Sequence, residues 1–204
     1  MKLWEHLRES MMRHPTQIIC ENDAMMSYEE AAIFAEILAK KLIGIKCCAI
    51  LCQSEMMTAL SLLGCFSAGV TAVPLSMRYG KAHCNKILER IQPNAIVTDA
   101  GGELEVLRLV DSEYCEPAIS PALIMCTSGT TGIPKGSMLS EKNILTNLSD
   151  ITDYFGISQK DVILIARPLY HCAVLTGEFL TALIKGAKIR FYSGAFSPAT
   201  ILQM

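Results

Sequence analysis

Apolar residues recur along the chain alternately at helical and at strand spacing. The first clear helix begins at Ser27, where Ser-Tyr-Glu-Glu forms a capping box in which the serine and Glu30 bind each other's backbone N–H groups. One apolar face then follows at helical spacing up to Gly44, made of Ala31, Phe34, Ala35, Leu38 and Leu42. The largely apolar segment 46–52 comes next and predicts a buried strand.

The same alternation continues through the sequence. Further strands are predicted at residues 71–75, 94–98, 122–126, 162–166 and 187–192. Further helices are predicted from Ser54 to about residue 68, around residues 84–91, from Ser140 to residue 155, near residues 178–185, and from Ser197 with Pro198 in the first turn. Such alternation is typical of an α/β fold built of layered, mostly parallel, doubly wound sheets.

An acidic segment at residues 99–121 interrupts this pattern. We predict a surface connection there, with at most one helical turn. It divides the chain into a first α/β portion, residues 1–118, and a second portion, residues 119–204, that contains the motifs described below.

Composition narrows the choice of partners. The 204 residues are 51% hydrophobic and carry a net charge of −2 without a run of basic residues, so neither nucleic acid nor an anionic membrane is expected as a partner. Residues 56–77 lack charge, but Gly64, Gly69 and Pro74 divide them into a helix and a strand, which argues against a membrane span. Nine cysteines without a Cys-x-x-Cys pair, and no secretory signal, are typical of reduced, buried thiols in a cytoplasmic protein.

The segment with the clearest chemistry is residues 127–136, which read Thr-Ser-Gly-Thr-Thr-Gly-Ile-Pro-Lys-Gly. Its glycines let the backbone approach a ligand, its hydroxyls are neutral donors, and Lys135 adds a positive charge, a combination suited to phosphate oxygens. A Walker A loop needs Gly-Lys followed by Ser or Thr at a helix start, whereas here Pro134 precedes the lysine and Gly136 follows it. We therefore predict an extended phosphate-binding loop and not a P-loop NTPase.

This segment resembles, at every position, the phosphate-binding signature of the adenylate-forming superfamily, which includes acyl-CoA synthetases, adenylation domains of nonribosomal peptide synthetases, and luciferases. The resemblance implies that ATP, with Mg²⁺ on its phosphates, and a carboxylic acid form an acyl adenylate with loss of pyrophosphate. A thiol of CoA or of a carrier protein's phosphopantetheine then takes the acyl group. The implied phosphate-binding residues are Thr127, Ser128, Gly129, Thr130, Thr131, Gly132, Lys135 and Gly136, with Lys135 also stabilising charge on the leaving pyrophosphate.

A second motif at residues 168–171, Pro-Leu-Tyr-His, resembles the next family signature, which borders the entrance for the carboxylate. It follows a predicted strand end, where open α/β sheets bind ligands, so His171 is a second candidate catalytic residue. The alternative is a packed histidine satisfied by backbone groups. After the loop, Ser140 and Asn143 agree with the family pattern, but Glu141 stands where a histidine is usual, and only a helix-entry role is expected for Asn143.

Members of the superfamily are considerably longer than this chain. Their segment of Tyr-Gly-x-Thr-Glu type, their ribose-binding aspartate and their small C-terminal domain with a catalytic lysine are not found in the 204 residues. We therefore expect the N-terminal part of an AMP-binding domain, from an acyl-adenylating ligase or from one half of a split enzyme that needs its other half as a partner. The alternative is a non-catalytic nucleotide-binding or interaction module that has kept the phosphate loop.

Overall fold

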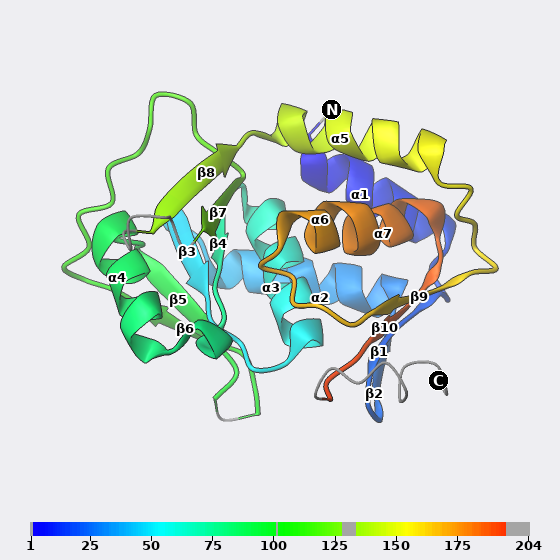
Figure 1. Cartoon of the computed structure of the whole chain (residues 1–204), viewed down its shortest axis with the longest axis horizontal. Helices are drawn as coiled ribbons and strands as arrows, with labels where there is room; N and C mark the ends of the chain where they lie inside the picture. The colour runs from blue at the N-terminus through cyan, green and yellow to red at the C-terminus, as the bar shows by residue number, and fades with distance from the viewer. Residues whose placement is uncertain (1, 101, 128–133, 195–204) are drawn as a thin grey trace.

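The computed structural model describes residues 2–100, 102–127 and 134–194, and places two β-sheets on either side of a group of helices (Figure 1). The helices are α1 (Leu3–Arg13), α2 (Tyr28–Lys41), α3 (Glu55–Ala68), α4 (Lys81–Ile91), α5 (Glu141–Tyr154), α6 (Cys172–Val174) and α7 (Thr181–Lys185), with a 3-10 turn η1 (Met77–Tyr79) and a π-helical segment η2 (Leu175–Leu180). The strands are β1 (Ile18–Glu21), β2 (Ala24–Ser27), β3 (Cys47–Ile50), β4 (Thr71–Pro74), β5 (Ala95–Thr98), β6 (Glu105–Arg108), β7 (Leu123–Thr127), β8 (Lys135–Leu139), β9 (Val162–Ile165) and β10 (Lys188–Phe191).

Both sheets are parallel in their interior. The larger sheet has the order β6-β5-β3-β4-β7-β8, with parallel pairing from β5 to β7 and antiparallel strands at both edges. The smaller sheet has the order β2-β1-β10-β9, in which only β2 is antiparallel. The predicted α/β class with mostly parallel, layered sheets is therefore confirmed. Each sheet combines strands from residues 1–118 with strands from residues 119–204, and the proposed boundary between these portions stays a prediction.

The helix α3 joins the two sheets, because it contacts β1 of the smaller sheet as well as β3 and β4 of the larger one. It begins after the N-cap Ser54 and ends at Gly69, which adopts a left-handed conformation with φ of 67°. Almost all of its side chains are buried, as a helix between two layers requires. In the part of the chain that the structure describes, no helix is both long and apolar enough to cross a bilayer.

The outer face of the larger sheet is covered by α4, which lies on the far side of that sheet from the other helices (Figure 1). A small apolar cluster fills this interface and contains Cys47, Ala49, Val73, Leu75, Ile87 and Ile124. The main core lies on the opposite side, among α1, α2, α3, α5 and η2. The larger sheet is thus buried on both faces, which agrees with the burial of every residue in its central strands β3 and β4, all of them apolar except Thr71.

The acidic segment after β5 contains a strand that the sequence did not predict. β6 pairs antiparallel with β5, and most of its side chains are exposed, so it carries no apolar alternation to detect. The guanidinium of Arg108 also donates hydrogen bonds to the carbonyls of Lys41 and Ile43, at 2.8 and 3.0 Å, beyond the end of α2. These residues therefore lie at the surface, as predicted, but the expectation of at most one helical turn missed the strand.

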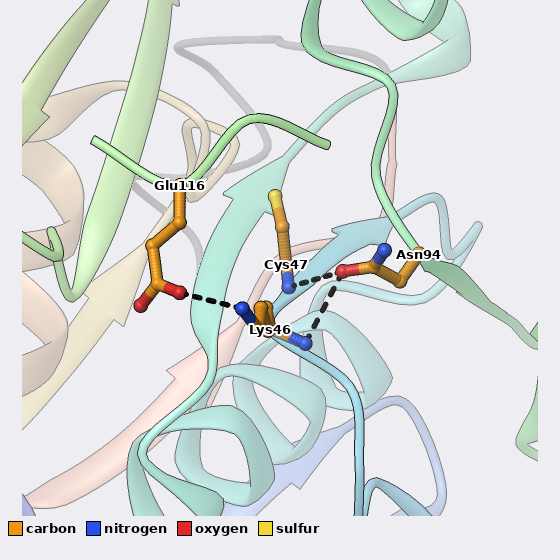
Figure 2. A network of polar contacts seen from close by, with 4 residues as sticks. All are labelled: Lys46, Cys47, Asn94 and Glu116. Atoms are coloured by element: carbon orange, nitrogen blue, oxygen red, sulfur yellow. Dashed lines mark hydrogen bonds and ion pairs between the residues drawn. The ribbon is translucent and has the colours of Figure 1, made fainter. Parts of the chain in front are cut away.

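Side-chain contacts hold the remainder of this connection against the start of β3 (Figure 2). The Asn94 amide oxygen accepts hydrogen bonds from the backbone N–H groups of Lys46 and Cys47, both at 3.2 Å, while its amide nitrogen donates to Ser112. The Lys46 ammonium lies 2.9 Å from a carboxylate oxygen of Glu116. These contacts keep the acidic segment at the edge of the larger sheet.

The hairpin of β1 and β2 was also not predicted. Its turn consists of Asn22 and Asp23, and Asn22 has a positive φ of 52°, a conformation that asparagine tolerates better than most residues. Two turn-forming residues between short apolar runs were the available signal. The predicted helix near residues 178–185 is in the structure the last part of a longer helical segment that begins at Cys172 and includes η2.

Close packing between α2 and α3 depends on Gly64. A Cβ atom at this position would lie 2.5 Å from Cδ2 and 3.0 Å from Cβ of Leu38, and the second contact cannot be relieved by rotating the leucine side chain. We expect Gly64→Val to lower the free energy of unfolding by about 2 to 3 kcal/mol through overpacking. Urea denaturation would measure the loss. Gly156→Val is the control, because a Cβ atom at Gly156 would have no neighbouring atom within 4 Å.

Candidate functional site

The two ends of the phosphate-binding segment form adjacent strands. Thr127 ends β7 and Lys135 begins β8, and the two residues are register partners, with the threonine hydroxyl donating a 3.4 Å hydrogen bond to the lysine carbonyl. The lysine therefore begins a strand and not a helix, which confirms that the segment is no Walker A loop. The predicted phosphate-binding residues Ser128, Gly129, Thr130, Thr131 and Gly132 lie outside the described residues.

Gly136 has a packing role that the sequence did not reveal. A Cβ atom at this position would lie 2.7 Å from Cγ2 of Ile124 on the neighbouring strand β7. A side chain would therefore push the two strands apart at the point where the loop begins. The glycine keeps the hairpin closed, whether or not its N–H group also meets a phosphate.

A small cavity of about 160 Å³ lies beside Lys135, between α4 and the hairpin. Arg90 of α4 also lines this cavity. Burial raises the pKa of the neighbouring Cys126 thiol to about 11, so this thiol is protonated and uncharged at neutral pH. Two residues with cationic side chains thus line the same cavity near the loop, and their positive charge favours anions nearby.

The second motif connects β9 to α6. Leu169 is fully buried, and its backbone N–H donates a 3.0 Å hydrogen bond to the carboxylate of Glu55 on α3. The N–H of His171 donates to the carbonyl of Pro168 at 3.2 Å, and the His171 carbonyl accepts a bond from Val174 at 3.0 Å. His171 is therefore the N-cap residue of α6, at the carboxyl end of a parallel strand, as predicted.

The His171 side chain is exposed at the surface, and its ring centroid lies 4.3 Å from that of Tyr170. Partial burial lowers the pKa of this histidine, and the positive charge of Arg167 lowers it further. Arg167 itself forms an ion pair of 2.7 Å with Glu178. Both causes favour the neutral imidazole, which can accept or donate one hydrogen bond at physiological pH.

A cavity of about 700 Å³ lies between α5 and the segment of α6 and η2 that follows His171. Its lining is mostly apolar, with Leu139, Ile144, Ile151, Phe155, Ala173 and Gly177 among its residues. A Cβ atom at Gly177 would meet only Ile151, at 4.0 Å, so this glycine leaves open space in the wall. π-helical segments such as η2 frequently occur at functional sites.

Asn143 lines the same cavity and has the helix-entry role that was predicted for it. Its side-chain oxygen accepts a 3.1 Å hydrogen bond from the Ser140 N–H, and the serine hydroxyl accepts one of 3.2 Å from the Asn143 N–H. This reciprocal pair is a capping box in which asparagine replaces the usual glutamate.

The sequence did not predict the cluster of carboxylates at the start of α3. Asp99 accepts hydrogen bonds from the N–H groups of Gln53 and Ser54, at 2.7 and 3.0 Å. Glu21 accepts bonds from the hydroxyl of Ser54 and from the N–H groups of Glu55 and Met56. The available signal was position, because both acids stand at the carboxyl ends of strands.

Glu55 completes this cluster and borders a third cavity of about 370 Å³, together with Thr58, Arg78 and Tyr170. Burial raises the pKa of Glu55 and the carboxylate of Glu21 adds to the rise, while the bond from Leu169 and the charge of Arg78 act in the opposite direction. Lys135 begins a strand of the larger sheet and lines the cavity beside α4, whereas His171 follows a strand of the smaller sheet and is exposed at the start of α6.

The cysteines were expected to be buried. This holds for Cys20, Cys47, Cys48, Cys52, Cys65 and Cys84, and is wrong for the exposed Cys115 and Cys172. Burial raises the pKa of Cys47 and of Cys52 to about 12, which makes these thiols poor nucleophiles. Over residues 2–100, 102–127 and 134–194, no group of three or more His, Cys, Asp or Glu side chains is arranged to hold a metal ion.

Comparisons with known proteins agree with these features. The pattern of the AMP-binding enzyme family matches residues 7–204. A feruloyl-CoA synthase from an Amycolatopsis species is 30% identical over 160 residues, which are 70% of this chain and 32% of the relative. A sulfoacetate–CoA ligase from Cupriavidus necator is 28% identical and is covered to 34%. The chain thus spans about a third of the length of these relatives.

Solved structures give the same picture. The O-succinylbenzoate coenzyme A synthetase of Bacillus subtilis, in complex with AMP, superimposes with a TM-score of 0.77 at 25% identity, over 97% of this chain and 57% of that chain. A fatty acid AMP ligase from Legionella pneumophila superimposes with a TM-score of 0.79 at 23% identity, over 99% of this chain and 40% of that chain. The second likeness shows the fold alone.

The charge of Arg167 should be measurable at His171. Because a nearby cation disfavours protonation, Arg167→Gln should raise the pKa of the imidazole towards its ordinary value, while the wild-type histidine titrates below that value. NMR titration of the His171 ring protons would measure both. Lys160→Gln removes an exposed cation elsewhere and serves as the control. A wild-type pKa at or above the ordinary value, or no rise in the Arg167 variant, would contradict this account.

Proposed function

The chain belongs to the AMP-binding enzyme family, and on that basis we propose that it is the N-terminal part of an ATP-dependent ligase that activates a carboxylic acid. The product of this step is an acyl adenylate, with pyrophosphate as the leaving group. The observation that carries the proposal is the hairpin of β7 and β8, which presents Lys135 at the edge of a loop of the phosphate-binding type, next to a cavity that Arg90 also lines.

Adenylate formation requires positive charge near the phosphates, because negative charge develops on the leaving pyrophosphate. In the reaction, a carboxylate oxygen of the acid attacks the α-phosphorus of ATP, the bond to the bridging oxygen breaks, and the electron pair stays on pyrophosphate. We propose that Lys135, the hydroxyl of Thr127 and the loop residues 128–132 bind the phosphates and stabilise this charge. Mg²⁺ would bind the phosphate oxygens and neutralise part of their charge.

The acid would approach from the side of His171. We propose that the N–H group of the neutral imidazole donates a hydrogen bond to the carboxylate and that the apolar cavity next to it, between α5 and η2, holds the acyl group. The wall is mostly apolar with a gap at Gly177, and its charged residues Arg167 and Glu178 form an ion pair, so it fits a hydrocarbon or aryl acid better than a charged one. The relatives include an enzyme named feruloyl-CoA synthase, and ferulate is an aryl acid.

The second half-reaction would transfer the acyl group to a thiol. Several relatives are CoA synthases or ligases, whereas a hybrid polyketide–nonribosomal peptide synthetase at 27% identity points to a carrier-bound thiol. We propose CoA as the acceptor, because the feruloyl-CoA synthase and the sulfoacetate–CoA ligase, which match more than two thirds of the chain, are CoA enzymes. A cytoplasmic location, where ATP and CoA are found, would suit this reaction.

Acid-dependent exchange of radiolabelled pyrophosphate into ATP tests the proposal. The exchange should be measured with the 204-residue chain and, if the gene encodes a longer protein, with that protein too. The acids to compare are ferulate, octanoate and L-phenylalanine. Exchange that needs ferulate or octanoate is the expected result. Tight binding of Mg-ATP by the chain without exchange in any form of the protein would instead favour the non-catalytic nucleotide-binding module.

Lys135 should matter for catalysis more than for folding. Lys135→Met removes the charge at the edge of the loop while keeping the length of the side chain, so we expect exchange to fall about 100-fold or more, as for the loss of other groups that stabilise developing charge. The midpoint of thermal unfolding should not change, because the side chain is exposed. Lys142→Met, at the exposed start of α5, is the matched control and should retain exchange.

Filling the gap at Gly177 should change acid use. Gly177→Phe places a ring in the cavity between α5 and η2, so the KM for the preferred acid should rise about tenfold or more while the KM for ATP changes little. Gly177→Ala adds one carbon in open space and should behave like the wild type. Equal effects of the phenylalanine variant on both KM values would place the acyl group elsewhere.

A further inference from the structure

The carboxylate of Glu55, the first residue of α3, binds a segment far along the chain. Its Oε2 atom accepts a hydrogen bond of 3.0 Å from the backbone N–H of Leu169, 114 residues later. Leu169 is fully buried, and a buried N–H group without an acceptor is costly. The bond from Glu55 therefore satisfies a backbone group that water cannot reach.

Glu55 is itself held in place from two directions. Its own N–H donates a 3.2 Å hydrogen bond to Glu21 at the end of β1, and the preceding Ser54 donates its N–H to Asp99 beyond β5. The carboxylate thus extends from a helix start that both sheets fix. Because its backbone is held in this way, the Glu55 side chain can hold the group that it binds in a well-defined position.

The segment that Glu55 binds carries the two aromatic rings of the second motif. The N–H of His171 bonds to Pro168 and its carbonyl to Val174, so these bonds are local to the turn. The bond from the Leu169 N–H to Glu55 instead links the turn to α3, a helix far from it in the sequence. Tyr170 then lines the cavity that Glu55, Thr58 and Arg78 also line.

We propose that Glu55 is a positioning residue, which fixes the Pro168–His171 turn on the start of α3 and thereby sets the place of the His171 imidazole at the carboxylate entrance. The proposal rests on the proposed function for the meaning of that entrance, but the tether itself is a property of the folded chain. Burial of Leu169 alone would hold the side chain and leave the backbone N–H without an acceptor. The hydrogen bond from Leu169 to Glu55 also fixes the orientation of the turn's backbone, and so the direction in which the chain continues to His171.

Amide exchange tests the tether without any assay of activity. In NMR-detected hydrogen–deuterium exchange, Glu55→Ala should accelerate exchange of the Leu169 amide about tenfold or more, because the acceptor is lost. Glu55→Gln keeps an acceptor oxygen and should stay within about threefold of the wild type. Glu141→Ala is the matched control, since Glu141 occupies the same first position of α5, after the N-cap Ser140. An unchanged Leu169 amide in the alanine variant, or an equal acceleration in all three variants, would overturn the tether.

Kinetics test the positioning role. With the most active acid of the panel above, Glu55→Ala should raise the KM for the acid about tenfold while the KM for ATP changes less than about twofold, and Glu55→Gln should restore the wild-type value. Faster Leu169 exchange without a change in acid dependence would overturn the positioning role. If the wild-type protein shows no acid-dependent exchange, the proposed function fails, and the amide-exchange result still decides whether the tether exists.

Discussion

The structure depends on hydrogen bonds to the backbone N–H groups at the start of one buried helix, α3. α3 lies between the two sheets, and the first N–H groups of any helix have no partner within it. Here Asp99 accepts from Gln53 and Ser54, and Glu21 accepts from Glu55 and Met56. Each of these N–H groups would cost about 1 to 3 kcal/mol if it were buried without an acceptor. Because one acid comes from each sheet, the same hydrogen bonds that satisfy the helix also lock the two sheets together.

This junction determines where a site can form. In the smaller sheet, β1 and β9 run in the same direction as β10, so Glu21 and the segment after β9 emerge at one edge. The turn from Pro168 to His171 therefore arrives beside the start of α3 as a consequence of topology. Ligands of open α/β sheets gather at this edge for the same reason. The side chain of Glu55 makes use of that proximity and holds the turn by its Leu169 N–H.

The sequence predicted those parts of the molecule in which local pattern and tertiary environment agree. The capping box at Ser27, the N-cap Ser140 and the apolar face of α2 marked helix starts and core positions correctly, because local pattern and tertiary packing agree there. β6 was missed since it is stabilised by backbone pairing with β5 and by Arg108, and neither leaves an apolar alternation. The carboxylates of Glu21 and Asp99 were missed for a different reason. Their partners lie more than 30 residues away, and a single sequence does not show which strand ends meet.

The two candidate catalytic residues come from different sheets. The hydrophobic core between the sheets therefore contributes to the proposed mechanism. Lys135 begins β8 at the edge of the larger sheet, whereas His171 follows β9 of the smaller one. A reaction between ATP held at the first and an acid held at the second would require the sheets to keep a fixed distance, because small misplacements of reacting groups slow a reaction strongly. The elements that set this distance are α3, its close contact with α2 at Gly64, and the acids at its start. Residues far from either candidate side chain would therefore influence the rate through geometry alone, and the apolar packing of α3 would serve the proposed catalysis as well as stability.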